Sequence, residues 1–187
     1  MFEREAKKID ETKGIWNILF LTKSTNYFEF SKWILKKITK DGVCIYLTIN
    51  RPYLALKEFM EEEKIDEERV QFIDAITKTI GGDFTERPNC KFLESPTDLT
   101  SFGIGVTNAY NKLSGKKEKI YLIVDTISTL LVYNSPISVI KFIHYINNRM
   151  KIFGINGVLL AMKEDLSEQM IATLSQFCNF VTEVGEE

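Results

Sequence analysis

The sequence predicts an α/β protein: a single three-layer domain with a mainly parallel sheet. Apolar runs of strand length alternate with stretches of helical period, and the predicted strands are apolar throughout rather than alternately apolar and polar. Strands of that kind are buried on both faces, as in parallel sheets whose crossover helices cover both sides. A length of 187 residues fits one such domain.

The first part of the chain predicts three strands and two helices. Strands are expected at residues 15–21, 43–48 and 70–73, which are rich in residues that strands favour. Helices are expected at residues 27–40, from the spacing of the apolar side chains, and at residues 52–63, which open with a proline.

The middle of the chain predicts a loop and then a helix. Residues 74–94 show no clean period and contain a Gly-Gly pair, so a long loop is expected there. The next helix should run from residue 95 to about residue 114. Ser95 is expected to cap it, with a proline in the first turn and Asp98 three residues after the cap.

The second half continues the alternation of strands and helices. Residues 119–125 form the most apolar predicted strand, which closes on Asp125. The elements expected after it are helices at 127–133 and 136–153, a strand at 157–162, a helix at 167–177 and a strand at 179–184. Residues 1–14 are charged throughout, so we take them as an N-terminal segment outside the domain of residues 15–187, and not as a signal peptide.

The composition excludes several classes of function. With 24 basic and 26 acidic residues, the chain lacks the basic excess of a dedicated nucleic-acid binder. The longest uncharged stretch, residues 126–140, is too short and too interrupted to span a membrane. One histidine and no Cys-x-x-Cys pair argue against zinc. We therefore expect a cytoplasmic protein that binds no nucleic acid, membrane, metal or cofactor.

The order of the segments resembles the RecA/KaiC-like P-loop ATPase core over residues 15–184. The resemblance rests on a strand feeding a loop and helix, on the strings RVQFID and IYLIVDTISTLLVYN, and on a final FVTEV. More narrowly, ESPTDLTSFGIGVTNAY, followed by IVDTISTLLVYNS and FIHYINNRM, is similar to an uncharacterised archaeal family of KaiC-like proteins that lack a P-loop. The resemblance implies a RecA-like sheet.

The resemblance places the phosphate-binding loop at residues 22–29, where the required residue types are missing. A P-loop needs glycines to turn backbone N–H groups toward phosphates, a lysine for the phosphates and a hydroxyl for magnesium. Here Thr22 and Tyr27 stand at the glycine positions, Phe28 at the lysine position and Glu29 at the hydroxyl position. A carboxylate near the start of a helix also repels phosphate.

The acidic residues that the resemblance implies after the second strand are replaced as well. Ile49 and Asn50 stand there, and neither side chain can act as a general base. Two lost elements predict a pseudo-ATPase. We further expect Tyr27 and Phe28 to fill the vacated nucleotide cleft, with residues 21–28 collapsed or helical and Glu29 in the first helical turn.

Four residues remain as a candidate vestigial nucleotide site: Lys23, Ser24, Thr25 and Asp125. The resemblance implies that Asp125, at the end of its strand, helps to hold magnesium. The alternative is that Asp125 caps the next helix, a task that Thr126 or Ser128 could share. A lone loop lysine such as Lys23 is usually solvated instead of binding an anion.

Two further features have structural interpretations. His144 borders the apolar stripe of its predicted helix and has no acid or nucleophile placed beside it by the sequence. Gly103 and Gly105 lie inside a helical pattern and not between a strand and a helix, so they predict close packing and not a dinucleotide-binding loop.

The favoured function is a non-catalytic RecA/KaiC-like domain acting as a protein-interaction or regulatory module. The alternative is a nucleotide-binding, NTPase-like protein that uses a non-standard site. We expect a protein partner or a homodimer, because residues 127–146 carry more apolar side chains than one helical pair buries against a sheet.

Overall fold

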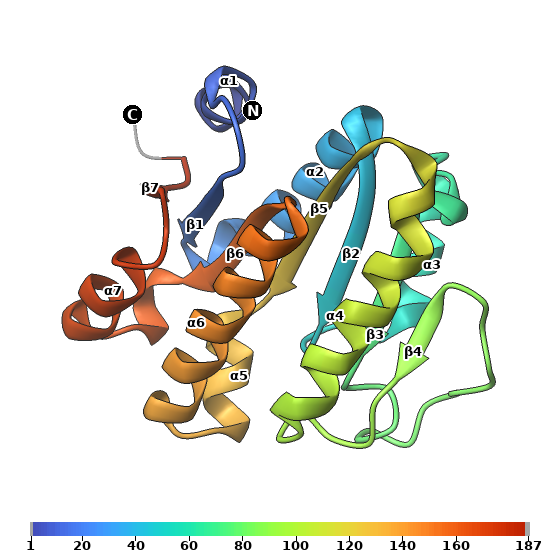
Figure 1. The fold of residues 1–187 in the computed structure, drawn as a ribbon. Coiled ribbons are helices and arrows are strands. Elements are labelled where there is room, and N and C mark those ends of the chain that lie inside the picture. The colour runs from blue at the N-terminus through green and yellow to red at the C-terminus, as the bar shows by residue number, and fades with distance from the viewer. Residues whose placement is uncertain (1, 186–187) are drawn as a thin grey trace.

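A computed structural model describes residues 2–185 and contains one seven-stranded sheet in the order β4-β3-β2-β5-β6-β1-β7 (Figure 1). Every neighbouring pair of strands is parallel. The strands are β1 (Asn17–Thr22), β2 (Gly42–Thr48), β3 (Val70–Asp74), β4 (Cys90–Phe92), β5 (Lys119–Asp125), β6 (Asn156–Met162) and β7 (Phe180–Glu183).

Helices cover both faces of the sheet, which confirms the predicted three-layer α/β domain. The α-helices of the described residues are α1 (Glu3–Glu11), α2 (Ser24–Asp41), α3 (Tyr53–Glu62), α4 (Leu99–Leu113), α5 (Ile127–Tyr133), α6 (Pro136–Phe153) and α7 (Glu168–Ser175). Successive residues of each strand point to opposite faces, so the sheet separates two apolar cores. One core packs against α4–α7 and the other against α1–α3.

The predicted and observed elements differ most in the middle of the chain. Residues 74–94 contain the short strand β4, which the sequence did not predict because three residues are too few to establish a period. This strand lies at the edge of the sheet and pairs only with β3. The predicted cap of α4 is also wrong: the helix begins at Leu99, and Asp98 accepts a hydrogen bond of 2.9 Å from the Ser101 N–H.

The close packing predicted for the two glycines of α4 is confirmed. A Cβ at Gly103 would lie 2.8 Å from Cε1 of Tyr145 in α6, and one at Gly105 would lie 3.0 Å from Cδ1 of Ile73 in β3. Both are closer than real Cβ contacts normally come. The two glycines therefore let α4 approach α6 on one side and the sheet on the other.

The N-terminal residues of the described chain form the helix α1. Its Ile9 is buried in the core that faces α2 and α3, and the ring of Phe2 lies 5.0 Å from the ring of Phe30 and 5.3 Å from that of Trp33. None of the helices within residues 2–185 has the length and apolar character needed to cross a membrane.

Candidate functional site

The candidate site lies where β1, β2 and β5 end, on the edge of the sheet that binds ligands in open α/β folds. Strands β2 and β5 are neighbours there, with Thr48 paired to Asp125. A single residue, Lys23, separates the end of β1 from the start of α2. Because α2 begins this early, Tyr27 lies in its first turn and reaches the end of β5.

Asp125 is fully buried at the centre of the site. The hydroxyls of Tyr27 and Tyr46 each donate a hydrogen bond to one of its carboxylate oxygens. Nη2 of Arg51 lies 3.4 Å from the oxygen that Tyr46 also contacts, and it donates to Oγ of Ser31 at 2.9 Å and to the hydroxyl oxygen of Tyr46 at 3.2 Å. We call Tyr27, Tyr46, Arg51 and Asp125 the Asp125 cluster.

The electrostatics of the Asp125 cluster follow from its burial. Burial raises the pKa of both Tyr27 and Tyr46, and the neighbouring charge of Asp125 raises it further. Burial by itself would lower the pKa of Arg51, but Tyr46 and Asp125 outweigh this effect and raise it. The phenols are therefore protonated donors, and the guanidinium and the carboxylate form a buried ion pair.

This arrangement closes the carboxylate to other ligands. Both oxygens of Asp125 already accept hydrogen bonds, and Asn50 Nδ2 donates to the Tyr27 hydroxyl at 3.2 Å from the outer side. A general base must lie within hydrogen-bond reach of the proton that it removes, and Asp125 is fully buried. These hydrogen bonds connect α2 and the end of β2 to the end of β5, so the role of Asp125 is structural.

The four residues predicted as a vestigial nucleotide site lie in two different environments. Lys23, Ser24 and Thr25 are exposed at the start of α2, whereas Asp125 is enclosed beneath Tyr27. The N–H of Ser24 points to a carboxylate oxygen of Glu164 at 3.3 Å. An acid thus lies at the helix start where an anion would have to bind.

The expected filling of the cleft is half right. Residues 24–28 are helical, as expected, and Tyr27 is only 6% exposed. Phe28, however, is 46% exposed, and its ring packs beneath the Lys32 ammonium at 4.2 Å and the Arg51 guanidinium at 5.2 Å. Glu29 lies in the second turn of α2 instead of the first, because the helix begins at Ser24.

The prediction that Asp125 caps α5 is wrong. Oγ1 of Thr126 accepts the capping hydrogen bond, 3.1 Å long, from the N–H of Thr129. Ser128 bonds across to the neighbouring strand, where its Oγ accepts the Met162 N–H at 2.8 Å. With the cap supplied by Thr126, the Asp125 carboxylate turns to the tyrosines instead.

Sequence reasoning missed Tyr46 and Arg51. A signal existed for both: Tyr46 places a hydroxyl inside an otherwise apolar strand, and buried hydroxyls need partners. Arg51 lies three residues after the end of that strand, at the same sheet edge as Asp125. An arginine and an aspartate at the ends of adjacent parallel strands form a plausible ion pair.

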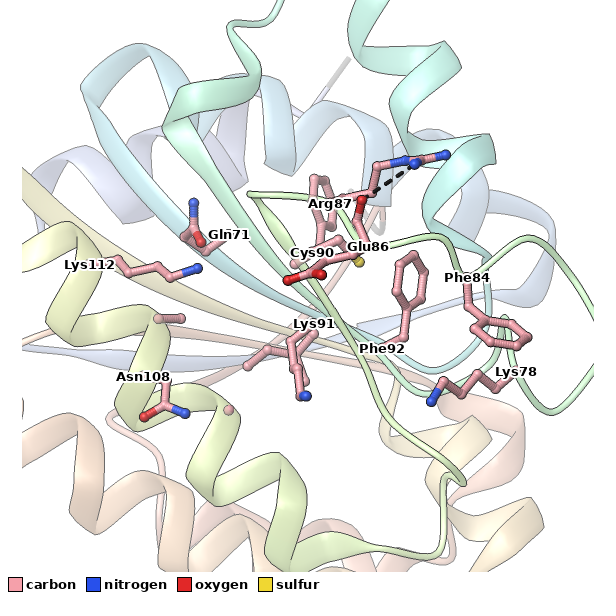
Figure 2. A pocket seen from close by; sticks show the side chains of 14 residues that line it. Gln71, Lys78, Phe84, Glu86, Arg87, Cys90, Lys91, Phe92, Asn108 and Lys112 are labelled. Carbon is pink, nitrogen blue, oxygen red and sulfur yellow. Dashed lines mark hydrogen bonds between the residues drawn. The ribbon is translucent and has the colours of Figure 1, made fainter.

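A hollow of about 480 Å³ lies at the β4 edge of the sheet (Figure 2). Lysine and arginine side chains from α4, from β4 and from the loop between β3 and β4 line it, and three of these four have the following partners. Lys78 pairs with Glu94, Arg87 Nη2 lies 3.0 Å from an oxygen of Asp83, and Lys112 donates to the Pro88 carbonyl at 3.1 Å. Because these basic side chains already have partners within the chain, the positive charge around the hollow does not indicate a bound anion.

The chain folds as a parallel α/β domain whose architecture is similar to that of solved KaiC-like proteins. Among solved structures, the chain is similar to an uncharacterized protein, PH0321, from Pyrococcus horikoshii in complex with an unknown peptide; the identity is 13%, the TM-score 0.72, and the match covers 97% of this chain and 82% of the other. It is also similar to the KaiC-like protein PH0186 of P. horikoshii OT3 (12%, 0.60, 90% and 71%). A third similar structure is the flagellar accessory protein FlaH of Methanocaldococcus jannaschii (11%, 0.61, 97% and 76%).

Residues 42–184 match the model of a family of unknown function, DUF7504. The match spans most of the chain, which therefore belongs to this family. No curated protein matches the chain in sequence.

Proposed function

We propose that this chain is a non-catalytic RecA/KaiC-like domain that acts as a protein-interaction or regulatory module. The observation that carries the proposal is the Asp125 cluster. At the position where the ATPase resemblance implies a magnesium ligand, the carboxylate already accepts two phenolic hydrogen bonds and pairs with Arg51. A metal ion would have to enter a fully buried site and compete with these three partners for the carboxylate.

The connection between β1 and α2 supports the same conclusion. A phosphate cradle requires several consecutive backbone N–H groups turned toward the ligand. Here a single residue, Lys23, joins the strand to the helix. The N–H of Ser24, the first residue of the helix, points to the carboxylate of Glu164. Together with Tyr27, Phe28 and Glu29 at the P-loop positions, this favours a domain that does not hydrolyse ATP.

We favour a protein as the ligand of this domain. PH0321, which shares this fold at 13% identity, was crystallised in complex with an unknown peptide. That precedent supports a protein partner, or a second copy of the chain, over a nucleic acid or a membrane, and the near balance of charge agrees. We place the protein in the cytoplasm.

Isothermal titration calorimetry with Mg-ATP tests the non-catalytic role. We expect no heat of binding and no phosphate release from the intact chain. A dissociation constant near 1 µM, about 8 kcal/mol of binding free energy, would contradict the proposal. Loss of such binding in Lys23→Ala, but not in the surface control Lys13→Ala, would establish the alternative nucleotide site of Lys23, Ser24, Thr25 and Asp125.

A further inference from the structure

A groove runs between α4 and α6 on the face of the molecule opposite α2 and α3. The two helices lie side by side in front of the sheet (Figure 1) and contact one another. The hollow between them measures about 470 Å³ and is lined mainly by apolar side chains, among them Leu99, Ile104, Phe142 and Tyr145. It is separate from the Asp125 cluster, which lies on the α2 side of the sheet.

The groove presents large apolar side chains to solvent. Ile104 on α4 is 57% exposed and Tyr145 on α6 is 45% exposed, while Phe142 forms a buried floor between them. Gly103 makes this geometry possible, because only a residue without a Cβ leaves room for the Tyr145 ring against α4. Exposed apolar side chains gathered around a hollow mark an interaction site more than a single exposed residue does.

The helices that form the groove carry positive charge alone. Residues 99–117 and 126–163, which include α4, α5 and α6, contain no aspartate or glutamate, although the whole chain has 26 acidic residues. Lys141 of α6 is exposed and lines the groove, whereas Lys112, near the other end of α4, lines the hollow at the β4 edge. The acid at the start of α4, Asp98, uses its two oxygens to accept hydrogen bonds from Ser101 at 2.9 and 2.6 Å.

The charge of the groove favours a negatively charged partner over a second copy of the chain. A symmetric contact between two copies would bring the same patch of each copy together, and so would bring the two Lys141 side chains near one another with no carboxylate among the described residues that line the groove. A partner with negative charge avoids this repulsion and gains attraction from Lys141, the one charged residue within residues 2–185 that lines the groove. A groove between two helices that has apolar walls and a lysine at its side fits an amphipathic helix.

We propose that the α4–α6 groove binds an acidic amphipathic helix of a partner protein. Apolar side chains on one face of that helix contact Ile104, Phe142 and Tyr145, and its carboxylates face Lys141. The inference rests on the proposed function and names the surface and the chemistry through which the domain interacts.

A displayed library of helix-forming peptides, selected on the full chain, provides the test. Synthetic copies of the selected peptides are then measured by fluorescence anisotropy. We expect these peptides to be rich in Asp and Glu, to carry apolar residues at i, i+3 or i+4 and i+7, and to bind more weakly as salt is added. Binding should fall by about tenfold or more in Ile104→Glu and in Lys141→Glu.

The matched control is Ile80→Glu, which adds the same charge at another exposed isoleucine, 59% exposed, away from the groove. It should leave the affinity unchanged, and circular dichroism should show that all three variants are folded. Peptides without an acidic bias, equal binding to Ile104→Glu, or no selectable peptide would each overturn the proposal.

Two further outcomes would assign the groove to another occupant and likewise overturn the proposal. One is a dimer in analytical ultracentrifugation that Tyr145→Glu dissociates. The other is displacement of the peptide by a single-stranded oligonucleotide. Mg-ATP calorimetry tests the non-catalytic role separately. If no acidic peptide binds the groove and no heat of ATP binding is seen, the proposed groove site is wrong but the proposed function is not contradicted.

Discussion

The hydroxyl of Tyr27 donates a hydrogen bond to the carboxylate of Asp125, 98 residues further along the chain. The bond joins the first turn of α2 to the end of β5 at the edge of the sheet where a ligand would bind. Because Tyr46 and Arg51 complete the contacts of the same carboxylate, the site is closed by side chains of the chain itself.

Replacing Asp125 with asparagine should destabilise the protein by about 2–4 kcal/mol. The change leaves the guanidinium of Arg51, which is only 12% exposed, without its countercharge, and an unpaired buried charge is costly. Urea unfolding followed by circular dichroism measures the loss. Asp165→Asn, at an exposed position, is the control and should stay within about 0.5 kcal/mol of the wild type. Equal stability of the two variants would show that the ion pair contributes little.

Gly42→Ala should destabilise the fold by about 3 kcal/mol, since a Cβ at this position would overlap the backbone carbonyl of Lys119 on the adjacent strand β5. The backbone of paired strands cannot move aside as a flexible side chain can. Gly115→Ala is the matched control, because a Cβ there meets no atom within 4 Å. Thermal unfolding should show a lower midpoint for Gly42→Ala alone, and a normal midpoint would contradict this account of the β2–β5 contact.

The cysteines should react slowly in the folded protein. Burial raises the pKa of the Cys178 thiol to about 12. Burial also raises the pKa of Cys44 and of Cys90, and the charge of Asp74 raises that of Cys90 further. Compared with a thiol of pKa about 9, Cys178 then holds roughly a thousandfold less thiolate at pH 8, and the thiolate is the reactive form. Iodoacetamide labelling followed by mass spectrometry should find all three thiols protected until guanidinium unfolds the chain. Fast native labelling of Cys178 would refute this.

Most of the fold could be predicted from the sequence because its signals are local. The strand at residues 119–125 and the helices at 127–133 and 136–153 have the predicted bounds. The apolar pattern extends over many residues in each of these segments, and Pro136 marks the start of the helix at 136–153. Strand β4 escaped prediction because it has three residues and is held by pairing with β3, a contact that no local pattern encodes.

The site could be predicted only in part, for a related reason. The sequence shows directly that residues 22–29 contain no glycine, and it predicted that an aromatic residue would be buried there. The contact of Tyr27 and Tyr46 with Asp125 depends on the order of strands in the sheet, which brings together residues 98 and 79 positions apart. Phe28 was placed wrongly because its neighbours Lys32 and Arg51 give the ring a partner at the surface.

The two tyrosines of the Asp125 cluster should make the protein sensitive to alkali. Their pKa values are raised in the folded state, first by burial and then by the charge of Asp125, whereas a tyrosine in the unfolded chain ionises near pH 10. Below that pH both states hold the protons and the stability is fully present. Above it the unfolded chain releases protons that the folded protein keeps, so the free energy of unfolding falls by about 1.4 kcal/mol per pH unit for each such tyrosine.

Tyr27→Phe therefore separates this effect from the other groups that titrate at high pH. The variant loses one hydrogen bond, which lowers its stability at pH 8 by about 1–2 kcal/mol. Above about pH 10, its free energy of unfolding should fall less steeply than that of the wild type, by about 1.4 kcal/mol per pH unit, because one of the buried phenols is gone. Urea unfolding across the alkaline range measures both quantities. Identical slopes for the two proteins would mean that Tyr27 ionises as readily in the folded state as in the unfolded chain, which a phenol enclosed against a carboxylate cannot do.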